Sequence, residues 1–156
     1  CNLEEGIPYP DDSFDVVSAG EVIEHIYDPD RLLREARRIL RPGGHVVLTT
    51  PNLQAWYNRA LFVAGIQPIF YETSTKSSDI GAGPLKKFKL DSAPVGHVRV
   101  FNRTALLDLL ASESFRTVDV RGSEFERLPG AIARMDRWFS RLPSLASNLV
   151  VLAAAE

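Results

Sequence analysis

The stretch that decides the fold is residues 12–52, which read DSFDVVSAGEVIEHIYDPDRLLREARRILRPGGHVVLTTPN. Near its start, 14–19 is a short run of aromatic and β-branched residues, and this predicts a strand that Gly20 ends. Near its end, 45–50 has the same character and predicts a second strand. The chain between the two strands is long enough to hold a crossover helix.

The residues between these strands carry the signals of a helix with defined ends. Asp28 is a residue type that caps helices, and Pro29 suits the first helical position. Pro42-Gly43-Gly44 is predicted to stop the helix and turn the chain. The apolar residues between these signals recur at the spacing of one helical face and are Leu32, Leu33, Ala36, Ile39 and Leu40.

The rest of the chain continues this alternation. We predict a helix over 53–64, an irregular segment over 66–97, a helix capped by Asn102, a strand over 116–121, a helix over 130–141 with Trp138 and Phe139 in the core, and a strand over 148–154. Alternating strands and helices are typical of an α/β sheet with crossover connections.

The two later strands differ in their polarity. Apolar and polar residues alternate over 116–121, which predicts a strand with one face in water. The run over 149–155 is apolar throughout, which predicts a strand covered on both faces.

Length and composition indicate one globular domain. The chain has 156 residues, a net charge of −2 and a single cysteine, Cys1, so neither an intrachain disulfide nor a cysteine metal site is possible. No basic stripe suggests a nucleic-acid partner, and no apolar run has the length of a membrane span. We therefore expect neither nucleic acid nor membrane as a partner, and a cytoplasmic location.

Several segments, in order, resemble one enzyme family. They are 12–17, 21–29, 38–44 and 49–52, and together they resemble the fourth strand, the segment after it, the helix exit, the fifth strand and the following loop of class I S-adenosylmethionine-dependent methyltransferases. The resemblance is nearest to the branch that includes ubiquinone-type O-methyltransferases and many small-molecule methyltransferases. It implies S-adenosyl-L-methionine as cofactor and a small-molecule acceptor, with oxygen favoured as the methylated atom.

The resemblance also implies an architecture. The fold is expected to be α/β, the C-terminal part of a Rossmann-like methyltransferase sheet, with strands four, five, seven and six in that order and the last strand antiparallel. On this template 14–19 is strand four, 45–50 is strand five, 116–121 is strand six and 148–154 is strand seven. The alternating strand then falls at the sheet edge, and the apolar strand falls between neighbours.

One part of the family pattern is missing. The chain has no G-x-G-x-x-G turn, and it lacks the acidic residue that would bind the cofactor's ribose. We therefore interpret 1–156 as a partial methyltransferase domain, N-terminally truncated, without the N-terminal cofactor-binding strands and inactive on its own. The alternative is a non-catalytic half-domain that binds a partner or self-associates through the edge of strand 14–19. A nicotinamide-dependent oxidoreductase is a further rival, but it needs the same glycine-rich turn.

The resemblance assigns two groups of cofactor-binding residues. Asn2 and Leu3 correspond to the pair that meets the adenine ring, although Asn2 can also be a frayed terminal residue. Ala19, Gly20 and Glu21 lie at the carboxyl end of strand four, where such sheets bind ligands, and they are expected beside the methionine part of the cofactor. The alternative for Gly20 is a simple turn glycine.

The candidate catalytic residues are Glu24 and His25. His25 can take a proton near neutral pH, or it can be a packed residue that braces the turn. Glu21 and Glu24 can orient His25 or be solvated charges. We predict no metal site, because the sequence shows no compact cluster of ligands.

Two further residues are candidates for contact with the acceptor. Asn52 follows the second strand and can touch the acceptor, cap the next helix, or both. His97 closes the irregular segment and can point at the acceptor or lie on a surface loop. We expect substrate specificity to reside in 66–97, because long irregular segments commonly carry binding residues.

Overall fold

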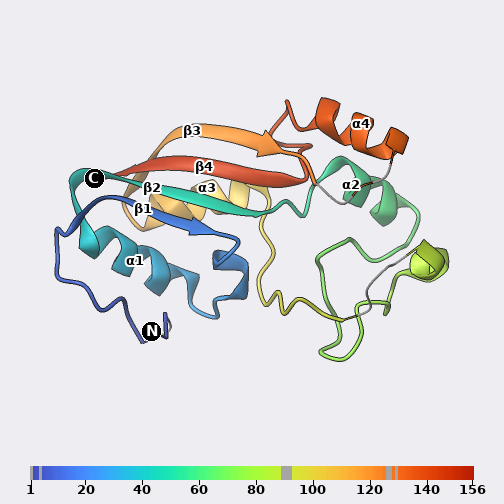
Figure 1. The fold of residues 1–156 in the computed structure, drawn as a ribbon, viewed down its shortest axis with the longest axis horizontal. Coiled ribbons are helices and arrows are strands. Elements are labelled where there is room, and N and C mark those ends of the chain that lie inside the picture. The colour runs from blue at the N-terminus through green and yellow to red at the C-terminus, as the bar shows by residue number, and fades with distance from the viewer. Residues whose placement is uncertain (1, 4, 89–92, 126–127, 129) are drawn as a thin grey trace.

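The computed structural model describes residues 2–3, 5–88, 93–125, 128 and 130–156. The strands among them are β1 Phe14–Gly20, β2 Leu40–Pro51, β3 Phe115–Ser123 and β4 Asn148–Ala155. The helices are α1 Pro29–Ile39, α2 Trp56–Val63, α3 Arg103–Ser112 and α4 Gly130–Phe139, with 3₁₀ turns η1 Ile23–His25 and η2 Gly83–Phe88 (Figure 1).

The four strands form one mixed sheet in the order β1-β2-β4-β3. β1 and β2 are parallel, whereas β4 is antiparallel to both β2 and β3. The predicted order of strands four, five, seven and six and the antiparallel last strand are therefore confirmed. β3, the strand of alternating polarity, lies at an edge as expected, and β4 lies between two neighbours.

β2 begins earlier than the sequence predicted. It starts at Leu40, directly after α1, and includes Pro42-Gly43-Gly44, so this tripeptide is an irregularity within a strand. The register with β1 shifts here, because Leu40 pairs with Phe14 while His45 pairs with Val16. Gly44 fits because a Cβ atom there would lie 2.8 Å from the carbonyl oxygen of Arg41.

Side chains cap two of the helices as the sequence predicted. The Asp28 carboxylate accepts a hydrogen bond of 2.9 Å from the Arg31 amide at the start of α1, with Pro29 in the first turn. The Asn102 side chain accepts one of 2.9 Å from the Ala105 amide at the start of α3. Each cap satisfies a backbone N–H that has no partner within its helix.

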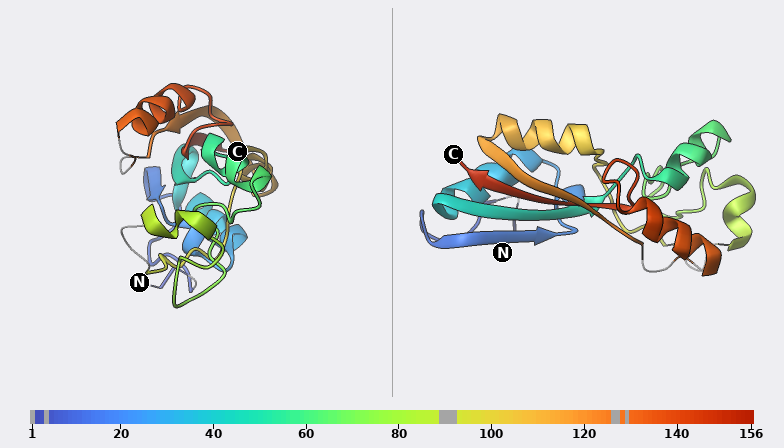
Figure 2. Two further views of the ribbon diagram at one scale, coloured as in Figure 1. Left: turned by 90° about the vertical axis from the view of Figure 1, so that its right-hand side faces the viewer. Right: turned by 90° about the horizontal axis from the view of Figure 1, so that it is seen from above.

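α1 and α3 lie on the same face of the sheet (Figure 2). The core fills the space between them, and its largest fully buried side chains include Leu33, Val46, Leu48, Leu106, Leu110, Leu149 and Val151. Residues on the opposite face of β4, Val150 and Leu152, are only half-buried. The prediction that β4 is covered on both faces is therefore wrong, because the helices shield one face alone.

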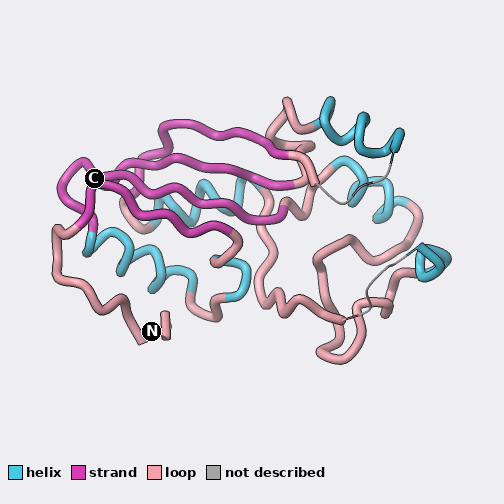
Figure 3. Tube along the Cα trace, in the orientation of Figure 1, coloured by secondary structure: helices cyan, strands magenta, loops and turns pink. Residues whose placement is uncertain are grey.

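The long segment between α2 and α3 and the helices α2 and α4 lie beyond one end of the sheet (Figure 3). Asp136 of α4 binds three segments of the chain at this end of the sheet. Its fully buried carboxylate accepts hydrogen bonds from the Trp56 indole N–H at 2.8 Å, the Phe125 amide at 2.7 Å and the Ser147 hydroxyl at 2.5 Å. Trp138 is 58% exposed, so its predicted place in the core is wrong.

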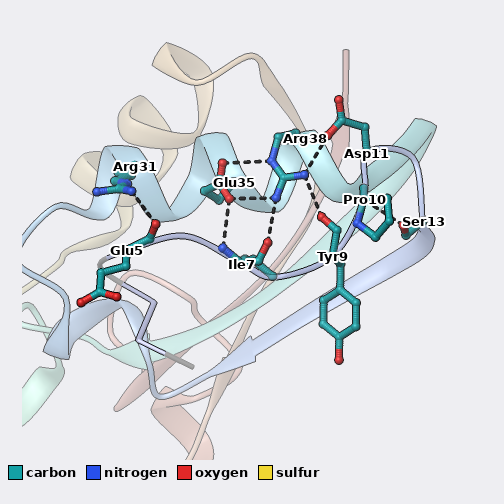
Figure 4. A network of polar contacts seen from close by, with 9 residues as sticks. All are labelled: Glu5, Ile7, Tyr9, Pro10, Asp11, Ser13, Arg31, Glu35 and Arg38. Carbon is teal, nitrogen blue, oxygen red and sulfur yellow. Dashed lines mark hydrogen bonds and ion pairs between the residues drawn. The ribbon is translucent and has the colours of Figure 1, made fainter.

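An ionic network holds the N-terminal segment against α1 (Figure 4). The Arg38 guanidinium binds both carboxylate oxygens of Glu35, at 3.0 and 2.9 Å, and donates to Asp11 and to the Tyr9 carbonyl. The hydrogen bonds from Arg38 and from the Ile7 amide lower the pKa of Glu35 to about 2. Among the described helices, none is long and apolar enough to cross a membrane.

Candidate functional site

The candidate site lies where β1 and β2 end. These strands are parallel and Gly20 pairs with Thr49, so their carboxyl ends share one edge of the sheet. The chain leaves β1 through Glu21 into η1, and it leaves β2 through Asn52. In open α/β sheets, ligands bind outside this edge.

Glu21 makes the turn at the end of β1 in an unusual backbone conformation. Its φ angle is +53°, which costs a non-glycine residue about 1–3 kcal/mol. Thr49 stabilises the turn, because its carbonyl oxygen accepts from the Glu21 amide at 3.0 Å and its hydroxyl donates to the Glu21 carboxylate at 2.8 Å. The turn directs the chain into η1 and thereby places Glu24 and His25.

Glu24 is a buried acid with one unused oxygen. Its side chain is 2% exposed, and Oε2 accepts a hydrogen bond of 3.0 Å from the Thr50 hydroxyl. Oε1 is buried and has no hydrogen-bond partner among the residues that the structure describes. Burial raises the pKa of this carboxyl above its usual value, and the hydrogen bonds only partly oppose the change.

His25 lies beside this acid and is partly open to solvent. Its Nε2 atom is 3.9 Å from Glu24 Oε1, and its Nδ1 atom is 3.1 Å from the carbonyl oxygen of Gly96. The side chain is 34% exposed, so one edge of the ring remains accessible. The position suits a residue that exchanges a proton with a ligand.

His97 reaches the same place from the long irregular segment. Its ring centroid is 4.8 Å from that of His25, and its Nδ1 atom is 3.3 Å from the carbonyl oxygen of Phe70. The Phe70 ring packs edge-on against it at 5.6 Å. His97 therefore belongs to the same group as the two predicted catalytic residues.

Glu24, His25 and His97 each offer one ligand or proton-accepting atom, and these atoms all lie within 4.8 Å of one another. The expectation that the chain has no compact cluster is corrected here, because His97 comes from a distant segment. That no metal binds stays a prediction. Glu24 and His97 also line a small pocket of about 10 Å³, roughly the space of one water molecule.

Asn52 has a structural position. It is fully buried, its amide donates to the Ala146 carbonyl at 2.8 Å, and its side-chain oxygen accepts from the Gln54 amide at 3.0 Å. The predicted helix cap is wrong, since Ala55 is the N-cap of α2 and no side chain caps it. Contact of Asn52 with an acceptor stays a prediction.

Asn2 and Leu3 contact residues other than Glu24, His25 and His97. The Asn2 amide donates to the Glu5 carboxylate at 2.9 Å, and Leu3 packs against the edge of the core. Asn2 also lines an open groove of about 400 Å³ that includes Glu35 of α1. Their contact with an adenine ring stays a prediction.

The end of β1 is open to close approach by a ligand. Gly20 is exposed, and a Cβ atom there would meet only the Thr49 hydroxyl, at 3.4 Å, so a ligand can approach its backbone closely. The Glu21 carboxylate accepts from Thr49 and retains capacity for a further hydrogen bond. That Ala19, Gly20 and Glu21 lie beside the methionine part of a cofactor stays a prediction.

Two residues of this site were not among the predicted ones. Thr50 binds the buried Glu24, and Glu72 binds the backbone of the segment that carries His97. Thr50 follows the predicted strand pattern and could have been identified as a buried polar residue. Glu72 stands alone in an irregular segment, where no periodicity indicates its partners.

Solved structures with a similar fold include a methyltransferase from Thermotoga maritima, described as a possible histamine N-methyltransferase. It has a TM-score of 0.59 and 20% identity, over 98% of this chain and 61% of that one. A family model described as a methyltransferase domain matches residues 1–48. A probable S-adenosylmethionine-dependent methyltransferase of Mycolicibacterium smegmatis is 33% identical over 121 residues, which is 78% of this chain. The chain is therefore similar in sequence to S-adenosylmethionine-dependent methyltransferases and shares their fold.

Another similar protein is an O-methyltransferase by its description. The human mitochondrial ubiquinone biosynthesis O-methyltransferase is 40% identical over 52 residues, which is 33% of this chain and 14% of that protein. The chain spans about a third of the mycolicibacterial methyltransferase, 35% of its length. The cofactor of this methyltransferase family is S-adenosyl-L-methionine.

Proposed function

We propose that an enzyme containing this chain transfers a methyl group from S-adenosylmethionine to a small-molecule acceptor, with oxygen as the methylated atom. The observation that carries the proposal is the accessible His25, at the carboxyl edge of the sheet and beside the buried Glu24. A hydroxyl acceptor must lose its proton as it is methylated, and a neutral imidazole can take that proton near neutral pH.

The residues of the chain would divide the work as follows. S-adenosylmethionine, when bound, supplies an electrophilic methyl group on a sulfonium. Ala19, Gly20 and Glu21 would position it along the end of β1, and Asn2 and Leu3 would meet its adenine. His25 Nε2 would accept the acceptor's proton, and Glu24, whose Oε1 lies 3.9 Å from that atom, would stabilise the imidazolium that forms. His97 would line the binding site of the acceptor. Asn52 would support that site through its hydrogen bonds to the Ala146 carbonyl and the Gln54 amide.

Support for oxygen comes from two sources. The name of the human relative specifies an O-methyltransferase. A general base is needed for a weakly acidic hydroxyl, whereas a neutral amine can attack without one. Alignment and proton removal are the contributions that the protein makes when the cofactor brings the reactivity.

A second candidate function is a binding module that works through β1. Within the described sheet, β1 pairs only with β2, and Val16 is 56% exposed. An unpaired strand edge is a template for another chain. Because the 156 residues hold no G-x-G-x-x-G turn, we also propose that the isolated chain binds the cofactor weakly and is inactive alone.

The test is transfer of a labelled methyl group from S-adenosylmethionine to paired phenols and anilines. The enzyme that contains this chain is compared with the isolated 156 residues. Labelling of phenols by the enzyme supports the proposal, and labelling of anilines alone contradicts oxygen as the acceptor. Calorimetric titration of the isolated chain should show weak cofactor binding. No transfer to any acceptor, together with self-association of the chain, would favour the binding module.

A further inference from the structure

Glu72 makes an unusual set of contacts in the irregular segment between α2 and α3. Its carboxylate accepts hydrogen bonds from three consecutive backbone amides, those of Val95 at 2.6 Å, Gly96 at 2.8 Å and His97 at 3.1 Å. Three N–H groups in succession form a concave site for an anion. The contacts join two parts of the chain that are more than twenty residues apart.

The electrostatics of this clamp favour a charged carboxylate. Burial by itself would raise the pKa of Glu72, but the three amide hydrogen bonds outweigh it and lower the pKa below its usual value. Gly96 has a φ angle of +91°, a conformation open to glycine, and this lets its N–H point at Glu72 while its carbonyl points elsewhere. Glu72 is therefore ionised, and the clamp closed, at neutral pH.

The Gly96 carbonyl points at His25. Its oxygen lies 3.1 Å from His25 Nδ1, and a carbonyl oxygen can only accept a hydrogen bond. Neutral His25 must then carry its proton on Nδ1, which leaves the lone pair on Nε2 facing Glu24 Oε1 at 3.9 Å. Glu72 and the three amides that it binds, those of Val95, Gly96 and His97, form the clamp. Because the clamp fixes Gly96, and Gly96 accepts from His25, the clamp selects Nε2 as the basic nitrogen of His25.

The same logic holds for His97. Its backbone amide is the third donor to Glu72, and its Nδ1 atom lies 3.3 Å from the Phe70 carbonyl oxygen. Phe70 has a φ angle of +72°, a strained conformation for an aromatic residue, and so its backbone is held in place. Both imidazoles, when neutral, therefore carry the proton on Nδ1 and the lone pair on Nε2.

We propose that Glu72 is a positioning residue that fixes the tautomer of His25 through the Gly96 carbonyl and holds His97 against it. The effect of this clamp on catalysis rests on the proposed function, in which His25 Nε2 accepts a proton. The clamp itself is a property of the folded chain. A merely structural Glu72 would support the segment without selecting the tautomer of a histidine.

The test uses nitrogen-15 NMR of the histidine rings, which distinguishes the two tautomers. The chain has three histidines, and His45, in the middle of β2 and outside the group of Glu24, His25 and His97, is the internal reference. In the wild type we expect His25 as the Nδ1–H tautomer. Glu72→Gln should mix the tautomers of His25 and weaken the His25–His97 ring contact, with His45 unchanged. Glu113→Gln is the matched control, because Glu113 is ion-paired with Arg34 away from the site.

The outcomes separate the clamp from the proposed function. A wild-type His25 in the Nε2–H form overturns the inference without any variant, and so does an unchanged His25 in a folded Glu72→Gln protein. If that variant does not fold, Glu72→Asp keeps the charge and should retain the Nδ1–H form; loss of that form in a folded Glu72→Asp chain overturns the inference. In the enzyme, Glu72→Gln should lower kcat by roughly ten- to a hundredfold with little change in KM. Normal turnover of a His25→Ala enzyme would refute the proposed base and leave the clamp standing.

Discussion

The Nδ1 atom of His25 lies 3.1 Å from the carbonyl oxygen of Gly96, a residue 71 positions further along the chain. This contact joins the turn after β1 to the irregular segment before α3. It directs the other ring nitrogen of His25 toward the buried Glu24. The candidate site is therefore assembled from two distant segments, and variants of either should alter it.

His25→Ala should lower the turnover number of the enzyme more than its affinity for cofactor or acceptor. The physical reason is loss of a group that takes a proton in the transition state, which contributes about 10²–10⁴-fold. Steady-state kinetics with a phenolic acceptor measure the effect. His45→Ala is the control, since His45 lies in the middle of β2 and is not part of the group of Glu24, His25 and His97. An unchanged kcat would leave His25 as a turn residue.

Glu24→Gln should become more stable relative to the wild type as the pH rises from 4 to 8. The folded-state pKa of Glu24 is raised by burial, so the folded chain holds a proton that the unfolded chain has lost. Wild-type stability from this group is present at low pH and is lost as pH rises through the raised pKa. Glutamine cannot titrate and can still accept from Thr50. Thermal unfolding of both proteins across this pH range measures their relative stability. If the two stabilities change with pH in the same way, the raised pKa of Glu24 is contradicted.

Asp136→Ala should destabilise the fold by about 3 kcal/mol or more. The substitution leaves the indole of Trp56, the Phe125 amide and the Ser147 hydroxyl without their acceptor, and each buried unsatisfied group costs about 1–3 kcal/mol. Urea denaturation gives the free energy of unfolding. Asp108→Ala, at an exposed position of α3, should change it by less than about 0.5 kcal/mol. Equal effects from both would show that the Asp136 contacts are not made in solution.

Val16→Lys should reduce self-association of the isolated chain. The edge of β1 opposite β2 has no partner strand in the described sheet, and Val16 is 56% exposed beside it. A lysine on an edge strand discourages pairing with another chain. Light scattering over a concentration series measures the mass, and Val63→Lys on the exposed surface of α2 controls for added charge. A wild type that stays monomeric at high micromolar concentration would contradict the prediction.

Local sequence determined most of the secondary structure because the signals act over a few residues. Asp28 and Asn102 cap their helices as predicted, since a cap needs only an amide three residues away. The strands over 14–19 and 148–154 follow from β-branched and apolar runs, and their order in the sheet followed from the family resemblance. The start of β2 was missed, because proline and glycine stop a helix but can also sit in an irregular strand.

The candidate site was only half visible in the sequence. Glu24 and His25 are adjacent and follow a strand, so their place at the carboxyl edge of the sheet could be inferred. The contact of His97 with these residues depends on how the segment between α2 and α3 returns to the sheet, and so do the three amide hydrogen bonds to Glu72. Periodicity and spacing thus determined the elements of this protein. The tertiary structure alone decided which side chains meet, because contacts across many irregular residues leave no local pattern.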